Sequence, residues 1–182
     1  MSAKDLHGAR VASASQIAAG QYLMFTLGEE TFACRISCIR EIIECPAMTA
    51  IPLAPAFLRG VINLRGAVVP VVDLSIRFER AQTVIGERTC IVIVEIDGDE
   101  GGQSLGVIVD GVTAVLDVEA SEIEARPNLG NGIRNEFVAG MIRQEQGFVL
   151  MLDMARVLSG QELEQLVSLE QGVAPATEVE QG

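Results

Sequence analysis

Four cysteines and a single histidine are the side chains of this chain best suited to nucleophilic or metal chemistry. A Cys–His or Ser–His–Asp site needs the histidine beside its nucleophile, but His7 lies in an Ala- and Ser-rich stretch without hydrophobic periodicity. Cys34, Cys38 and Cys45 are separated by three and six residues, which does not match the spacing of paired zinc ligands. We therefore expect buried, reduced thiols at these positions and at Cys90, with no catalytic or metal site.

The chain also lacks the residues that would bind cofactors or charged polymers. No Gly-Lys-Ser or Gly-Lys-Thr sequence is present for a P-loop, and the acidic turn at 97–102 lacks the ligand pattern of a calcium loop. The 25 acidic and 13 basic residues give a formal net charge of −12, which repels nucleic acid and anionic lipid. We expect no cofactor, no nucleic-acid partner and no membrane insertion.

Arg65 and Glu41 are the charged residues with a candidate binding role. Arginine is common where proteins dock, because its planar fork pairs with carboxylates while its stem packs. From spacing alone an ordinary surface ion pair is the better interpretation. The alternative is a charge pair beside a docking groove.

A β-hairpin at 57–74 is predicted to position Arg65. The apolar runs 61–64 and 68–72 are rich in Val and Ile, and Arg65-Gly66 joins them, so Arg65 lies at the tip. Gly66 supplies the backbone freedom of the turn. Pro70 cannot donate a ladder hydrogen bond, which predicts a sheet edge or a bulge.

The same pattern occurs again later in the chain, which predicts a duplicated β-unit. The repeated residues share one offset: Phe57, Gly60, Ile62, Val69 and Asp73 recur as Phe137, Gly140, Ile142, Val149 and Asp153. A weaker match aligns 105–115 with 32–42. The second copy lacks the Arg-Gly tip, which indicates a separate role for the first tip.

The hydrophobic pattern predicts an all-β body with few helices. Further strands are expected at 21–27, 31–36, 89–96, 104–109, 112–118, 137–142 and 148–152, a helical turn or twisted segment at 39–43, and a long loop at 119–134. A short C-terminal helix is expected at 161–169, capped by Ser159. We expect a flexible tail at 1–20, a body at 21–169 with two intertwined barrels that divide near 85–90 and near the C-terminal segment, and an acidic flexible tail at 170–182.

These motifs resemble the CheW family of chemotaxis coupling proteins. The resemblance rests on Phe57-Leu-Arg-Gly-Val-Ile-Asn-Leu-Arg-Gly66, the following Val-Val-Pro-Val-Val-Asp-Leu74, Arg40-Glu-Ile42 and the region of Gly140. It implies two SH3-like five-stranded β-barrels and a non-enzymatic adaptor. The adaptor would link a CheA-type histidine kinase, through its regulatory domain, to the helical tips of methyl-accepting chemotaxis receptors.

The resemblance also implies a receptor-binding groove between the barrels. Its predicted residues are Ile39, Glu41, Gly60, Arg65, Gly106, Val112, Val115 and Gly140. It assigns no kinase-contact residues. Since no secretory signal or bilayer-spanning apolar run is found, a cytoplasmic protein recruited to membrane receptor arrays is expected.

Two alternatives stay open at this point. One is a coupling protein of a chemosensory pathway that controls pili or gene expression instead of swimming. The other is a small-ligand-binding β-barrel or an enzyme, which would need convergent polar groups in a pocket.

Overall fold

The computed structural model describes residues 19–98, 101–125, 135–145 and 147–158. Its strands are β1 (Gly20–Leu27), β2 (Glu30–Arg35), β3 (Ile39–Glu44), β4 (Leu58–Leu64), β5 (Ala67–Asp73), β6 (Cys90–Gly98), β7 (Gly101–Val109), β8 (Gly111–Val118), β9 (Ile123–Glu124), β10 (Val138–Gln144) and β11 (Gly147–Leu152). The helices in these ranges are short: α2 (Leu74–Arg77), α3 (Met154–Val157) and the 3-10 turns η2 (Ile36–Cys38), η3 (Ala120–Glu122) and η4 (Asn135–Phe137). Residues 1–18 of the predicted N-terminal tail, the helix at 161–169 and the tail at 170–182 lie outside these residues, whereas Gly20, the last residue of the predicted N-terminal tail, begins β1.

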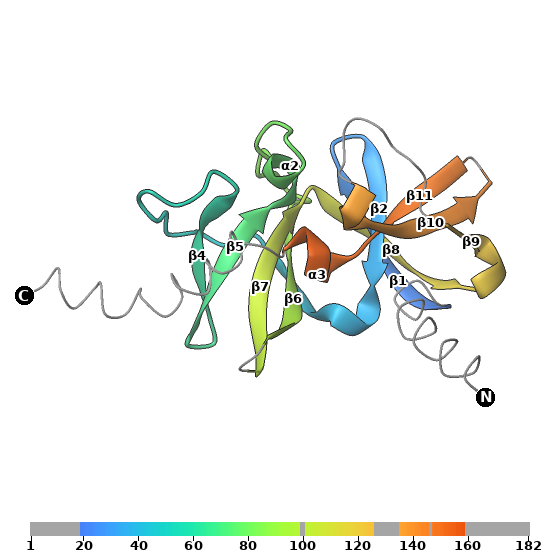
Figure 1. The fold of residues 1–182 in the computed structure, drawn as a ribbon. Coiled ribbons are helices and arrows are strands. Elements are labelled where there is room, and N and C mark those ends of the chain that lie inside the picture. Colours follow the sequence, from blue (N-terminus) through green and yellow to red (C-terminus); the bar gives the residue numbers. More distant parts are fainter. Residues whose placement is uncertain (1–18, 99–100, 126–134, 146, 159–182) are drawn as a thin grey trace, which may run out of the picture.

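The strands form two mixed sheets that lie side by side (Figure 1). One sheet, which we call barrel A, has the order β8-β1-β2-β11-β10-β9. The other, barrel B, has the order β3-β6-β7-β5-β4. The prediction of an all-β fold with two similar strand sets is confirmed, and barrel A carries β9 as a sixth, short strand.

The strand registers confirm the predicted duplication. Hairpins β4–β5 and β10–β11 carry the same irregularity, just before Gly60 and just before Gly140. Each hairpin is closed at its base by the same bond, in which an aspartate N–H donates to a phenylalanine carbonyl. The distances are 2.7 Å from Asp73 to Phe57 and 2.9 Å from Asp153 to Phe137.

The duplication extends upstream of these hairpins, and there each copy contributes its first hairpin to the barrel of the other copy. Ala33 of β2 pairs with Met24 and Met151, and Gly106 of β7 makes the equivalent pairs with Ile93 and Val71. Hairpin β1–β2 therefore corresponds to β6–β7. The N-terminal hairpin completes barrel A with β8–β11, whereas barrel B is built from the continuous segment β3–β7.

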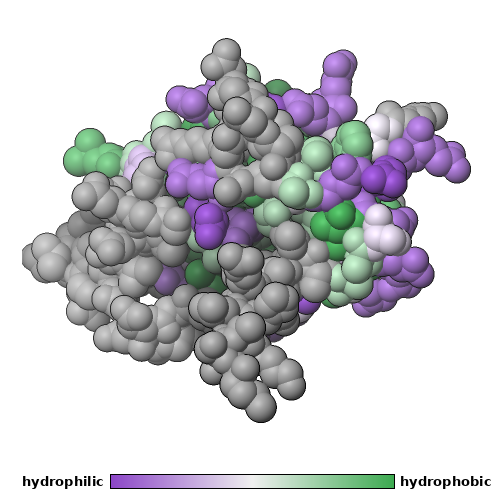
Figure 2. All heavy atoms as spheres, turned by 45° about the vertical axis from the view of Figure 1, so that its right-hand side comes forward, coloured by the Kyte–Doolittle hydropathy of each residue, from purple (hydrophilic) through white to green (hydrophobic). Residues whose placement is uncertain are grey.

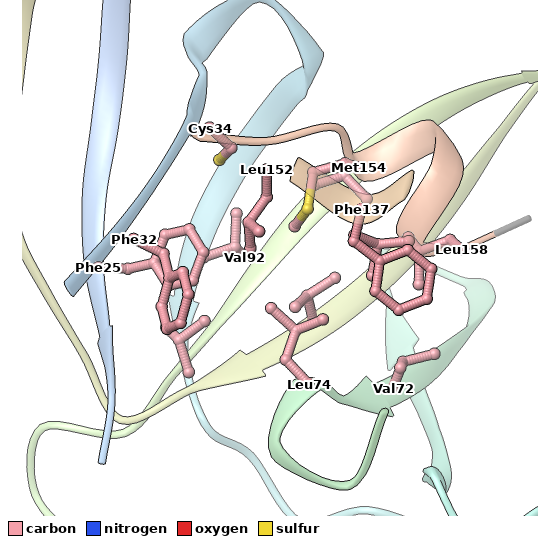
Figure 3. Packing of buried hydrophobic residues seen from close by; sticks show 14 of the residues in the cluster. Phe25, Phe32, Cys34, Val72, Leu74, Val92, Phe137, Leu152, Met154 and Leu158 are labelled. Atoms are coloured by element: carbon pink, nitrogen blue, oxygen red, sulfur yellow. The ribbon is translucent and has the colours of Figure 1, made fainter. Parts of the chain in front are cut away.

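Alternating side chains of each sheet divide the apolar core into three parts. Each barrel has a small interior cluster, with Tyr22, Met24 and Ala33 in barrel A and Ile91 and Ile93 in barrel B. The largest cluster, the shared core, takes the opposite faces of both sheets together with α2 and α3. Figure 3 shows residues from both barrels converging there; those labelled are Phe25, Phe32, Cys34, Val72, Leu74, Val92, Phe137, Leu152, Met154 and Leu158.

Pro70 corrects one expectation. Strand β5 lies between β4 and β7 and Pro70 is buried, so it is not at an exposed edge. Its partner Val61 exchanges both backbone hydrogen bonds with Thr49, each 2.9 Å, so that pair needs no donor from Pro70. The β7 ladder begins only at Val71. The missing N–H therefore falls where no neighbouring strand requires it.

Two other local expectations are resolved by the structure. The segment 39–43 forms strand β3, and the only helical turn beside it is η2. The region 119–134 begins with η3 and β9, and its residues 126–134 lie outside the described ranges. Within the described chain, no helix has the length and apolar character needed to cross a membrane.

Candidate functional site

The β4–β5 turn holds Arg65 in a conformation that arginine does not favour. Leu64 pairs with Ala67, so Arg65 and Gly66 form a two-residue turn with φ of 53° and 88°. A turn with two positive φ values favours Asn-Gly over Arg-Gly. The Asn63 side chain supports the turn by accepting a 2.9 Å hydrogen bond from the Gly66 N–H. Turn stability therefore does not explain the arginine.

Arg65 and Glu41 form a two-pronged ion pair. Arg65 Nη2 donates to Glu41 Oε1 at 2.9 Å, and Nη1 donates to Oε2. The Arg65 side chain is 72% exposed and the Glu41 side chain 25%. The hydrogen bond from Arg65 lowers the pKa of Glu41, and the same bond raises the pKa of Arg65. Since β3 and β4 are the two end strands of barrel B, this pair spans its open seam.

The predicted aliphatic residues lie on the edge strands β3 and β8. Ile39 and Val112 occupy equivalent positions of the two copies, and both are partly buried against the shared core. Val115 is 49% exposed on β8. Its equivalent on β3 is Ile42, which is 40% exposed and was not predicted as a site residue. The weaker sequence match aligned these two positions and could have identified it.

The predicted glycines are buried within the barrels. A Cβ on Gly60 would lie 2.4 Å from the Thr49 carbonyl oxygen, and one on Gly106 would lie 2.8 Å from Ile91 Cγ2. Gly140 is buried at the equivalent bulge of β10. The structure thus brings Glu41 and Arg65 into contact. It places Gly60 against the backbone of Thr49 and Gly106 against the side chains of Ile91 and Val71.

A buried polar network around Asp73 was missed by sequence reasoning. The Asp73 carboxylate is fully buried and accepts from Arg59 Nη1 at 2.8 Å, from the Thr83 N–H and hydroxyl at 2.9 Å each, and from the Ser75 N–H at 2.9 Å. The network fixes the 79–88 loop against α2. The available signal was a difference between copies, because Asp73 recurs as Asp153 whereas Arg59 is replaced by Ala139.

Arg77 joins the two barrels at the equivalent phenylalanines. Its guanidinium lies 5.5 Å from the Phe57 ring centre and 5.1 Å from that of Phe137, and its Nε donates to the Val157 carbonyl at 2.8 Å. These contacts connect α2 with α3 across the shared core. They fix the barrels that carry β3 and β8.

The described residues offer contacts for a protein partner more readily than groups for catalysis. Cys34 is buried, the other three cysteines are partly buried, all four are free, and the described chain holds no cluster of three or more metal-ligating side chains. Among the coloured residues of the face in Figure 2, hydrophilic residues alternate with small apolar areas. Exposed apolar side chains on other elements are Leu53, Val84, Ile85 and Phe148.

Comparison with known proteins gives consistent matches over most of the chain. Residues 21–162 match the family model described as CheW-like domain. The Chemotaxis protein CheW of Treponema pallidum is 30% identical, covering 90% of this chain and 96% of its own. The Chemotaxis protein CheW of Klebsiella aerogenes is also 30% identical, over 79% of this chain and 84% of its own length. The crystal structure of the scaffolding protein TtCheW from Thermoanaerobacter tengcongensis superposes with a TM-score of 0.70 at 30% identity, covering 79% of this chain and 95% of that one.

These matches agree in extent with the duplicated fold and with the hairpin that carries Arg65. The family consists of scaffold proteins without enzymatic activity, which agrees with the expectation from the sequence. The chain belongs to the CheW-like domain family and is a coupling protein of chemotaxis signalling.

Proposed function

We propose that this chain holds a CheA-type histidine kinase to the helical tips of methyl-accepting chemotaxis receptors and passes receptor state to the kinase. One barrel binds the kinase's regulatory domain, and the kinase-contact residues are not assigned. The protein acts in the cytoplasm and is recruited to receptor arrays at the membrane. Family membership supports partners in chemotaxis signalling.

The receptor helix docks at a surface formed by β3, β8 and the Arg65 tip. We define this docking surface by the predicted residues Ile39, Glu41, Gly60, Arg65, Gly106, Val112, Val115 and Gly140. The exposed aliphatic side chains of Val115 and Ile42 suit the apolar face of an amphipathic helix. The three glycines act indirectly, by setting the strand positions.

The Arg65–Glu41 pair is the single observation that carries this proposal. Arg65 is exposed, its turn would accommodate asparagine better, and its guanidinium is oriented by two hydrogen bonds. An oriented, exposed guanidinium can bind a partner with little loss of conformational entropy. A purely structural role would not require an exposed arginine at a hairpin tip.

A pull-down with a receptor signalling tip and a CheA regulatory domain tests the proposal. Arg65→Glu should lose mainly the receptor tip, while its circular dichroism and thermal midpoint stay close to wild type. The matched control is Arg143→Glu. Arg143 also forms an exposed pair with a glutamate, Glu124, but in barrel A, where the sequence has no Arg-Gly tip. The control should bind both partners.

Either of two results would overturn the proposal. If wild type binds neither cognate partner, the adaptor function fails for these partners and the family match describes the fold alone. If Arg65→Glu and Arg143→Glu weaken receptor binding equally, the general charge of the surface is responsible and the Arg65 tip has no special part.

A further inference from the structure

Cys34 and Cys38 form a pair of neighbouring thiols at the start of β3. Cys34 ends the buried part of β2 and lies in the shared core, with 1% of its surface exposed. Cys38 is the last residue of η2, is partly exposed, and packs against the same core. Its thiol donates to the Arg35 carbonyl at 3.1 Å, which turns it back toward β2. The side chains of Cys34 and Cys38 are near enough for each thiol to be the largest influence on the pKa of the other.

The fold itself does not require this thiol pair. The strand registers make Cys34 equivalent to Val107. Cys34 pairs with Leu23 and Val107 pairs with Val92, which is the equivalent of Leu23 in the other copy. Both Cys34 and Val107 lie in the shared core. In the same alignment Cys38 corresponds to Gly111. One copy of the unit therefore forms this junction with a valine and a glycine. The fold therefore does not depend on the two neighbouring thiols of the other copy.

We propose that Cys34 and Cys38 form a peroxide-sensitive modification site that closes a disulfide bond across η2. Hydrogen peroxide oxidises the partly exposed Cys38 thiolate to a sulfenic acid and releases hydroxide. The buried Cys34 thiol then attacks the Cys38 sulfur, forming the S–S bond and releasing water. Hydrogen peroxide is the oxidant, and a thiol reductant restores both cysteines.

The electrostatics of the two thiols fit these roles. The interaction with the Cys34 thiol lowers the pKa of Cys38, against the opposing effect of burial, whereas the interaction with Cys38 and burial together raise the pKa of Cys34 well above its usual range. Cys38 therefore supplies the thiolate that reacts with peroxide, and Cys34 supplies the resolving thiol. The lowered pKa distinguishes Cys38 from Cys45 and Cys90, for both of which burial raises the pKa.

Disulfide formation would move η2 and the beginning of β3, which carries part of the proposed docking surface. An S–S bond holds the two sulfurs at about 2 Å, closer than a hydrogen bond allows, so η2 must shift toward β2. Because η2 continues directly into β3, the shift would reach Ile39 and Glu41. This consequence rests on the proposed function, whereas the oxidation chemistry does not.

The test is mass spectrometry of the full chain after peroxide treatment. Wild type should lose the mass of two hydrogens, and a thiol reductant should restore it. Trypsin cleaves after Arg35 and Arg40, which separates Cys34 from Cys38, so only a disulfide joins the peptide ending at Arg35 to peptide 36–40. The Cys45→Ser/Cys90→Ser double variant should give the same joined peptides.

Cys34→Val provides the matched control, since Val107 fills the equivalent site. It should keep the wild-type circular dichroism, form no joined peptides, and gain one oxygen at Cys38 that dimedone captures. Cys38→Ser should also form no joined peptides and should leave Cys34 unmodified. Joined peptides that include Cys45 or Cys90 in place of this pair would overturn the proposal. So would wild type in which Cys34 and Cys38 stay reduced after Cys45 and Cys90 have reacted.

Discussion

Arg59 and Asp73 form a buried ion pair on which three segments depend. Asp73 is fully buried and the Arg59 side chain is 13% exposed, and the same arginine also donates to the Thr83 carbonyl at 3.1 Å. The pair thus connects β4, the base of α2 and the loop that follows it. Its contribution differs from that of surface pairs, because a buried carboxylate without its partner cannot be hydrated.

Arg59→Ala should lower the free energy of unfolding by about 3–5 kcal/mol, since it leaves the Asp73 charge buried without a cation. Arg143→Ala is the matched control, because it removes an exposed arginine–glutamate pair and should cost about 0–1 kcal/mol. Urea denaturation followed by circular dichroism measures both. Equal losses in the two variants would contradict a special role for the buried pair.

The Glu41 carboxylate should report the Arg65 contact through its titration. The hydrogen bond from Arg65 keeps the folded-state pKa of Glu41 below its ordinary value, so the stabilisation is present above that ordinary value. It is lost as the pH falls through the lowered pKa. Carboxyl NMR titration of wild type and Arg65→Gln should show a higher midpoint in the variant. Identical midpoints would mean that the pair does not persist in solution.

At the scale of elements, Gly60 allows the 45–57 connection to pack against β4. Thr49 forms an isolated bridge with Val61, and its carbonyl would lie only 2.4 Å from a Cβ at position 60. The φ of Gly60 is 148°, a region that residues with side chains rarely adopt. Gly60 lies at the bulge of β4, and the second copy has a bulge at the equivalent Gly140.

Gly60→Ala should therefore destabilise the fold by at least about 1–3 kcal/mol, because backbone atoms cannot move aside as a flexible side chain can. Gly86→Ala is the control: its added Cβ meets nothing within 4 Å, and the N–H that donates to Thr89 is kept. That variant should stay within about 0.5 kcal/mol of wild type. Chemical denaturation compares the two, and a tolerated Gly60→Ala would show that the Thr49 bridge yields easily.

The sequence predicts elements better than it predicts their partners. The Val- and Ile-rich runs around Arg65-Gly66 identify β4 and β5, and the repeated Phe, Gly and Asp positions identify the duplication. The parallel pairing of β2 with β11 leaves no local signal, because periodicity records only which face of a strand is buried. The prediction of a sheet edge or a bulge at Pro70 has the same limit, since its second neighbouring strand β7 is distant in sequence.

The same holds for the site residues: local patterns identify some of them, but not which residues they contact. Both interpretations of Arg65 and Glu41 pair the two side chains, which the structure confirms. Spacing alone favours an ordinary surface pair, and only the family resemblance favours a docking role. Arg59 was not anticipated as the partner of Asp73, because fourteen positions separate them and no periodicity connects a strand residue with a helix cap. The comparison of copies was the available evidence, through Ala139 at the equivalent position.

At the scale of the whole molecule, we expect the shared core to make the two barrels one cooperative unit. Its members come from both sheets and from both short helices, whereas each barrel interior is smaller. Phe32 of barrel A lies 5.8 Å, centre to centre, from Phe78 of the segment after α2, and Phe78 lies 5.9 Å from Phe137. Removal of a large side chain from this core should therefore destabilise both barrels.

Phe32→Ala should cost about 3–5 kcal/mol and lower the unfolding midpoint of both barrels together. Phe148→Ala, at a position 53% exposed, should stay within about 0.5 kcal/mol. The chain has one tyrosine and no tryptophan, so the fluorescence of Tyr22 reports on the interior of barrel A while circular dichroism reports on both barrels. The two signals should give coincident curves, and separate transitions would contradict the cooperative unit.

The exchange of hairpins also sets the order in which a ribosome can deliver a complete barrel. Strands β3–β7 emerge in succession, so barrel B has all its strands once Val109 has left the exit tunnel. Hairpin β1–β2 is synthesised first yet cannot find its parallel neighbour β11 until almost the whole described chain exists. The nascent protein must therefore protect an N-terminal hairpin with an apolar face throughout translation. This apolar face of the hairpin packs against barrel B in the shared core. Barrel B can therefore cover it as soon as β6 and β7 have formed.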